Sequence, residues 1–108
     1  MKLHDKFEWD AGKAKSNSAK HGVMFEDAEA VLADPEADVF HYEVEDDANS
    51  TDEDRHITFG SDPDDRRIVL LIVWTDRSVR KTRVTRIISA RTATGKERRD
   101  YGKKISGR

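Results

Sequence analysis

The chain has 108 residues, 35% of them hydrophobic and 39% charged, with a net charge of −2, which suits one domain with a modest core. It contains no cysteine, which excludes disulfide bonds and thiolate metal ligands. No apolar run reaches the ~18 residues of a membrane span and no secretory signal is visible, so we expect a cytoplasmic protein. We expect residues 1–108 to form one domain, with an extra lead over 1–6, a core over 7–101 and a mobile tail over 102–108.

The first third of the sequence predicts a short strand and two helices. Phe7 to Trp9 places aromatic residues at period two, as in a strand. Asp10 is a candidate N-cap, and Gly22 a candidate C-terminal stop, for a helix over about 11–21. A second helix over 25–33 follows from apolar residues at helical spacing.

Four more strands and a last helix complete the pattern. The strands are predicted over 37–44, 55–60, 68–75 and 83–91, with an acidic stretch from Glu43 to Asp54 and short turns between the later strands. Thr94-Gly95-Lys96-Glu97 is a capping box that opens the last helix, which we expect to end at Gly102. The prediction is an α+β fold in which a four-stranded antiparallel sheet packs against two N-terminal helices and one C-terminal helix.

Charge is segregated along the chain. Residues 35–65 carry one basic and twelve acidic side chains, whereas residues 66–108 carry fourteen basic and three acidic ones. The basic last third indicates an anionic partner such as a nucleic acid. The alternative is that the acidic middle and the basic end neutralise each other within the monomer.

Arginines stand out inside two of the predicted strands. Regular alternation puts Arg86 on the apolar face of Val84 and Ile88, and Arg91 on the opposite face. A charge placed there needs a partner, the rim of the sheet or a ligand. The guanidinium fork suits phosphate oxygens; the alternative for Arg86 is a salt bridge to an acidic residue. Arg55 opens its own strand, and its alternative is a simple edge-strand charge.

The first predicted helix carries a second set of polar candidates. Lys13, Asn17 and Lys20 share one face, which is either a phosphate-binding surface or an ordinary solvated one. His21 is the best-placed general acid or base because imidazole titrates near neutral pH. Its alternative role is a favourable interaction with the C-terminal helix dipole.

Two aromatic residues have both a structural and a functional interpretation. Trp9 precedes the basic helix, so it either joins the core or offers a stacking platform for a base. Tyr101 lies on the last helix with Arg98 and Lys104, and the same two interpretations apply.

No Gly-rich phosphate loop, Ser-His-Asp arrangement or metal-ligand spacing occurs in the sequence. An enzyme with these residues is therefore expected to work without a metal ion or a cofactor. RNA cleavage meets that condition, because the 2′-hydroxyl can attack its own adjacent phosphate. The protein then supplies a general base, cations that stabilise the charge on phosphorus, and a proton for the leaving oxygen.

Several short motifs and single residues occur in a fixed order along the chain: Phe7-Glu8-Trp9-Asp10, Lys13, Asn17, Lys20-His21-Gly22-Val23, Phe25-Glu26, Asp34-Pro35, Arg55 with Gly60, Thr75 with Arg77, Arg86-Ile87-Ile88-Ser89-Ala90-Arg91, Ala93-Thr94, Glu97-Arg98-Arg99 and Tyr101. Their order and spacing resemble the BrnT toxins, the ribonuclease half of a bacterial type II toxin–antitoxin pair whose antitoxin is BrnA. The resemblance runs from Phe7 to about Tyr101. It departs at Met24, where the family usually has Ser or Thr, and in the long acidic segment from Glu43 to Asp54.

The resemblance implies a RelE-like fold and RNA cleavage that arrests translation. It also implies neutralisation by a BrnA-like antitoxin that covers the basic surface, a heterotetramer with that antitoxin, and DNA contact only through the antitoxin. We predict catalytic roles for His21, Arg55, Arg86 and Lys20, and RNA-binding roles for Trp9, Lys13, Arg91, Arg98 and Tyr101. No metal site is predicted.

Two other classes of function remain open at this point. One is a non-catalytic RNA- or partner-binding module that uses the same basic face. The other is a purely structural partner of an acidic or disordered protein. Only the nuclease predicts strand scission that survives a chelator.

Overall fold

The structure, a computed structural model, describes residues 6–33, 39–44, 55–62, 64–65 and 67–106. Its helices are α1 (Ala11–His21), α2 (Phe25–Ala33) and α3 (Gly95–Ser106). Its strands are β1 (Lys6–Glu8), β2 (Val39–Val44), β3 (Arg55–Ser61), β4 (Val69–Asp76) and β5 (Val84–Thr92). The predictions for residues 1–5, Asp34-Pro35, most of the acidic segment and the end of the tail lie outside the described residues.

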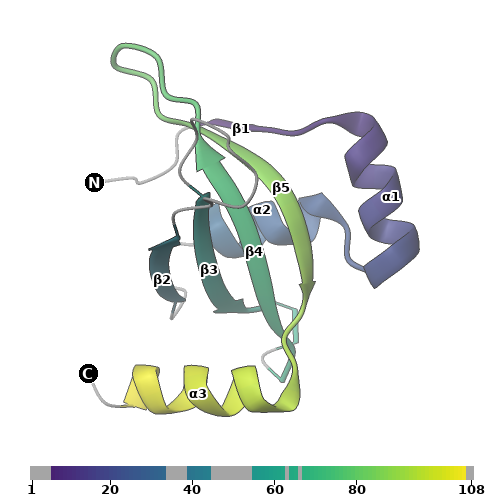
Figure 1. The fold of residues 1–108 in the computed structure, drawn as a ribbon, viewed down its shortest axis with the longest axis vertical. Helices are drawn as coiled ribbons and strands as arrows, with labels where there is room; N and C mark the ends of the chain where they lie inside the picture. Colours follow the sequence, from purple (N-terminus) through teal and green to yellow (C-terminus); the bar gives the residue numbers. More distant parts are fainter. Residues whose placement is uncertain (1–5, 34–38, 45–54, 63, 66, 107–108) are drawn as a thin grey trace.

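One sheet with the strand order β1-β5-β4-β3-β2 organises the fold (Figure 1). Strands β2 to β5 form the predicted antiparallel array of four. β1 adds a fifth strand at the edge, parallel to β5, with Glu8 opposite Arg86. The predicted α+β class is confirmed. The position of β1 in the sheet was not part of the prediction, because three residues carry too little pattern to specify a pairing partner.

The helix boundaries follow local capping chemistry. Asp10 caps α1 by accepting a hydrogen bond from the Lys13 backbone N–H (2.8 Å), and Gly22 ends the helix with φ 70°. Thr94 and Glu97 form the predicted capping box, since each side chain accepts from the other's backbone N–H (3.2 and 2.8 Å).

The prediction that Gly102 ends the last helix is wrong, because α3 continues to Ser106. A glycine inside a helix costs only about 1 kcal/mol relative to alanine. Lys103 and Lys104 follow in the last turn, where cations interact favourably with the helix dipole. The glycine is therefore tolerated within the helix.

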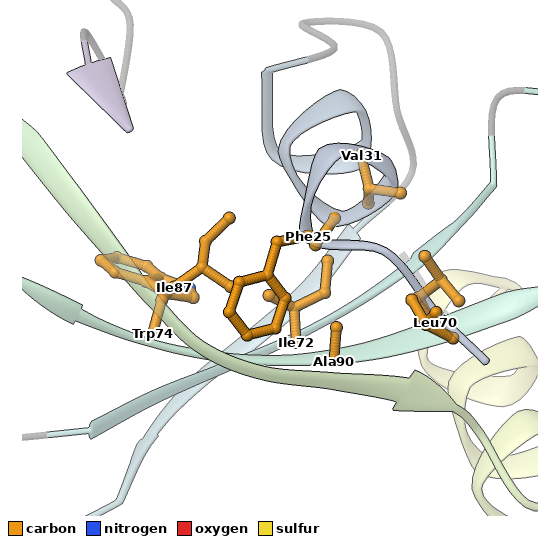
Figure 2. Packing of buried hydrophobic residues seen from close by; sticks show 9 residues of the cluster. Phe25, Val31, Leu70, Ile72, Trp74, Ile87 and Ala90 are labelled. Carbon is orange, nitrogen blue, oxygen red and sulfur yellow. The ribbon is translucent and has the colours of Figure 1, made fainter. Parts of the chain in front are cut away.

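Each face of the sheet packs against a different helix layer. Toward α2, the core contains Phe25, Ala28, Val31, Leu70, Ile72, Trp74, Ile87 and Ala90. Figure 2 shows Phe25 of α2 lying among Ile72, Ile87 and Ala90. On the opposite face, Tyr101 of α3 packs with Phe59, Val69 and Leu71 at one end of the sheet. We call this second surface the α3 face.

An irregularity in β5 changes which residues share a face. Trp74 pairs with Ile87 but Val73 pairs with Ser89, so the register shifts and Ile88 is left without an opposite residue. Ile87 and Ala90 consequently lie on the same side, in the same core cluster. The predicted regular alternation is therefore wrong beyond Ile87.

The arginines of β5 illustrate the consequence of the bulge. Arg86 pairs with Thr75 and Arg91 pairs with Leu71, and both partners lie on the same face of the regular strand β4. Because directly opposed residues point to the same side of a sheet, Arg86 and Arg91 share the α3 face. The sequence had predicted opposite faces for them.

None of the helices in the described part of the chain is long and apolar enough to cross a membrane.

Candidate functional site

A row of charged side chains crosses the sheet on the α3 face. Glu8 of β1 lies opposite Arg86 of β5, Arg86 opposite Thr75 of β4, and Thr75 opposite Arg55 of β3. Directly opposed residues have Cβ atoms about 4.5–5.5 Å apart and point to one side. The two arginines therefore flank a buried threonine, which is 2% exposed. We call these four residues the charged row.

Glu8 is held against Arg86 at one end of the row. Nη1 of Arg86 donates to Oε2 of Glu8 at 2.7 Å, and the two side chains are 31% and 43% exposed. The salt bridge foreseen as the structural alternative for Arg86 thus exists. It does not remove the arginine from consideration, since a guanidinium has five N–H donors and one bond uses a single donor.

Glu8 itself is a residue that the sequence prediction of the site omitted. The acidic residue lies in the Phe7-Glu8-Trp9-Asp10 motif, but nothing in its local pattern indicates a partner 78 positions later. Only the parallel pairing of β1 with β5 brings it next to Arg86. The signal available in the sequence was period two itself, which puts Glu8 on the opposite side of the strand from Phe7 and Trp9.

At the other end of the row, Arg55 is half-buried, and its Nε atom is shielded from solvent. β3 presents Arg55, Ile57 and Phe59 on the α3 face. The predicted sharing of one face by these three residues is therefore observed. The two terminal nitrogens carry four of the five N–H donors of a guanidinium.

Arg91, predicted to bind RNA, is engaged in the junction of β5 with α3. Nη1 and Nη2 of Arg91 donate to the two carboxylate oxygens of Glu97 at 2.8 and 2.9 Å. This bidentate pair, together with the capping bonds from Thr94, holds the pKa of Glu97 at about 2, below its usual 4.5. Arg91 therefore has an evident structural role on the α3 face.

The amide side chain of Asn17 fixes α1 to the edge of β5. At Ala90, which lies on β5 past the residues that pair with β1, the backbone N–H donates to Oδ1 of Asn17 at 3.1 Å. The backbone C=O of Ala90 accepts from Nδ2 of Asn17 at 2.8 Å. Nδ2 also donates to the Val23 carbonyl at 3.0 Å, so one 7%-exposed side chain joins three segments. Asn17 thereby acts like a short additional strand, and Figure 1 shows α1 beside this edge.

The anchoring of α1 by Asn17 determines the direction in which the lysine side chains of this helix point. Ala14 packs on the core toward α2, while Lys13 and Lys20 lie on the other side of Asn17 around the helix. Helical periodicity thus turns both exposed lysines toward the α3 face, alongside β5. His21 is exposed in the last turn.

The structure does not bring the four predicted catalytic residues together. Arg55 and Arg86 share the charged row. Lys20 and His21 follow Asn17, which is level with Ala90. Ala90 and Arg86 pair with Ile72 and Thr75, which are three positions apart on β4, a separation of roughly 10 Å along the sheet.

The remaining predicted RNA-binding residues lie in different environments. The ring of Trp9 packs edge-on against Phe25, with centroids 5.9 Å apart. Tyr101 is 8% exposed and its hydroxyl lies 3.4 Å from that of Ser61, so it belongs to the core. Arg98 is exposed on α3 and donates to the Arg67 carbonyl at 3.4 Å. Of these three, Tyr101 is buried, Trp9 is half-buried and Arg98 is exposed.

Among the residues that the structure describes, no group of three or more His, Asp or Glu side chains is arranged to hold a metal ion. The charged row offers two guanidinium groups whose N–H donors can bind phosphate oxygens, with a carboxylate beside one of them.

Fold and surface together define a small α+β protein that presents arginines and a carboxylate on the open part of one sheet face. Residues 9–97 match the family described as the ribonuclease toxin, BrnT, of type II toxin–antitoxin systems. The match covers most of the chain, which therefore belongs to the BrnT family. No curated protein gave a match. Because it belongs to this family, the chain is a ribonuclease toxin of a type II toxin–antitoxin system, in which the toxin is paired with an antitoxin.

Proposed function

We propose that this chain is an endoribonuclease that cleaves RNA without a metal ion and thereby arrests translation in the cytoplasm. The observation that carries the proposal is the charged row, in which Arg55 and Arg86 flank Thr75 and Glu8 contacts Arg86. Two arginines on one sheet face can hold the non-bridging oxygens of a single phosphate and stabilise the extra negative charge of the transition state.

Glu8 is the proposed general base. Its carboxylate takes the proton of the 2′-hydroxyl as that oxygen attacks the adjacent phosphorus. The bond from phosphorus to the 5′-oxygen breaks, and a proton from solvent or a nearby acid goes to that oxygen. The products are a 2′,3′-cyclic phosphate and a 5′-hydroxyl. Partial exposure of Glu8 supports this role, because the carboxylate can exchange its proton with water between turnovers.

Lys20 and His21 were predicted to be catalytic; we now assign them to RNA binding along β5, together with Lys13, which was predicted to bind RNA. Their position beside Ala90 would extend a phosphate track away from the charged row. His21 remains the competitor of Glu8 for the general base, and the two assignments predict different mutants to be inactive.

The test is cleavage of a structured RNA in low salt with excess EDTA. We expect fragments from the wild type and a loss of roughly 100-fold or more in Glu8→Gln and Arg86→Ala. In His21→Ala we expect little change in the rate at saturating RNA. Arg99→Ala is the control, because Arg99 is exposed on the side of α3 opposite Tyr101. Scission in Arg86→Ala at the wild-type rate would remove the charged row from the mechanism.

The same experiment separates the nuclease from the alternative function. RNA that is bound but left intact by the wild type would favour a non-catalytic binding module with the same basic face. Scission that stops on addition of EDTA would contradict the metal-free mechanism.

We also propose that a BrnA-like antitoxin neutralises the toxin by covering the α3 face. The complex is expected to be a heterotetramer of two toxin and two antitoxin chains that meets DNA only through the antitoxin. Light scattering of the co-purified complex gives its mass. An antitoxin that still binds Arg55→Glu/Arg86→Glu as tightly as wild type would place the interface elsewhere.

A further inference from the structure

Between β4 and β5 the chain forms a narrow projecting hairpin over residues 77–83, which we call the basic hairpin. Val79 and Thr82 exchange backbone hydrogen bonds at 3.1 Å in both directions, and the Arg77 N–H donates to the Val84 carbonyl at 2.8 Å. The side chain of Ser78 accepts from the Val84 N–H at 3.1 Å. The hairpin is therefore a hydrogen-bonded ribbon, and Figure 1 shows it projecting from the sheet at the end away from α3.

The charge of the basic hairpin has a single sign. Arg77, Arg80, Lys81 and Arg83 are all exposed, and residues 77–83 include no carboxylate. The nearest acidic residue in sequence, Asp76, accepts a hydrogen bond from the Ser78 N–H at 2.8 Å at the base of the ribbon. The tip thus carries concentrated positive charge into solvent, a feature typical of surfaces that contact polyphosphates.

The residue at the tip, Arg80, adopts a backbone conformation that is unfavourable for an arginine. Arg80 has φ 56°, in the left-handed region where glycine or asparagine is favoured. Its neighbour Val79 is 65% exposed, so packing does not explain the shape of the tip. Arg80→Gly would relieve the backbone while removing the guanidinium group.

The basic hairpin continues directly from the charged row. Thr75 and Arg86 pair in the row, and Asp76 pairs with Thr85 immediately before the ribbon begins. Arg80 is five positions after Thr75, which corresponds to roughly 17 Å along an extended strand. An RNA strand that crosses the row toward this end of the sheet carries several phosphates over that distance.

We propose that the basic hairpin binds the RNA backbone several nucleotides from the scissile phosphate. This inference rests on the proposed function, because it assigns a second contact to the same substrate. The hairpin supplies affinity through Arg80 and Lys81 and takes no part in bond breaking. A polyanionic backbone fits better than a protein partner, since the tip offers charge without an apolar patch beyond Val79.

The test uses the double variant Arg80→Gly/Lys81→Ser and a control of equal charge, Lys15→Ser/Lys103→Ser. Both control lysines are exposed, on the outer sides of α1 and α3. Binding of each full-length protein to a 2′-O-methyl RNA, which cannot be cleaved by 2′-hydroxyl attack, is measured by fluorescence anisotropy between 50 and 200 mM salt. Cleavage of the matching RNA is measured in parallel.

We expect the hairpin variant to bind roughly tenfold more weakly at 50 mM salt, with a log–log salt slope less steep by about 1.4 than that of wild type. Its cleavage rate at saturating RNA is expected to equal that of wild type, while KM rises. The control is expected to keep the wild-type slope. Thermal unfolding verifies the fold, which Arg80→Gly should preserve because it relieves the backbone.

The outcomes separate this inference from the proposed function. An unchanged salt slope in the hairpin variant overturns the inference while leaving cleavage by the wild type intact. Wild-type binding without scission overturns the nuclease, and the slopes still decide the role of the hairpin. A wild type that binds no RNA overturns both.

Discussion

Replacing Asn17 with alanine should destabilise the protein more than any exposed change on α1. The side chain makes three hydrogen bonds, to both backbone groups of Ala90 and to the Val23 carbonyl. Each bond contributes about 1 kcal/mol net, and the backbone groups left without a partner add to the cost. We therefore expect a loss of about 2–4 kcal/mol, a large fraction of the 5–15 kcal/mol typical of a domain.

Urea unfolding followed by circular dichroism measures this loss. With a slope of about 1–2 kcal/mol per molar, the midpoint should fall by roughly 1–3 M. Ser16→Ala is the matched control. Ser16 is exposed on the same helix, and its replacement by alanine raises the helix propensity by about as much as Asn17→Ala does. A midpoint for Asn17→Ala equal to that of Ser16→Ala would refute the view that Asn17 substitutes for a strand at this edge.

Three further changes test local features by the same measurement. Gly102→Ala should stabilise α3 by about 0.5–1 kcal/mol, because a Cβ at this position meets open space; a destabilised variant would contradict its helical placement. Met24→Ser should raise the free energy of unfolding by about 0.5–1.5 kcal/mol, because a serine side chain can supply the missing N-cap of α2. At present only the backbone carbonyl of Met24 accepts hydrogen bonds there. An unchanged stability would mean that the backbone at this position cannot adopt cap geometry. Glu97→Gln keeps the capping bonds but loses the ion pair with Arg91. Since the pKa of Glu97 is lowered from 4.5 to about 2, its stabilisation is present above pH 4.5 and is lost as pH falls toward 2. Because partial exposure screens the ion pair, the free energy of unfolding of Glu97→Gln should be lower than that of wild type by about 1–2 kcal/mol at pH 6, and the difference should vanish near pH 2. A difference that does not depend on pH would contradict the ion pair as its cause.

Local signals in the sequence were sufficient for most elements of the fold. Asp10, Gly22 and the Thr94–Glu97 capping box specify helix ends through contacts within a few residues, and each was predicted correctly. Gly102 misled the prediction because a glycine stop and a tolerated interior glycine look alike without the packing of α3.

The candidate site was harder to predict because it depends on pairings between distant strands. Arg55 and Arg86 could be named from their placement in apolar strands, but not their common row. The bulge at Ile88 reversed the expected face of Arg91, and no residue type marks that bulge in the sequence. Tyr101 and Trp9 had two interpretations each; burial places Tyr101 in the core, whereas Trp9 is half-buried against Phe25.

The parallel pairing of β1 with β5 also has a consequence for the order of folding during synthesis. Glu8 and Arg86 are 78 positions apart, so their contact closes nearly the whole chain into a loop. Chains grow from the N-terminus at about 5–20 residues per second, and β5 is the last strand to leave the ribosome. A nascent chain therefore carries Glu8 and Arg55 for several seconds without the strand that joins them. The charged row assembles only after β5 has been translated, so a nascent chain that ends before Arg86 cannot present that surface.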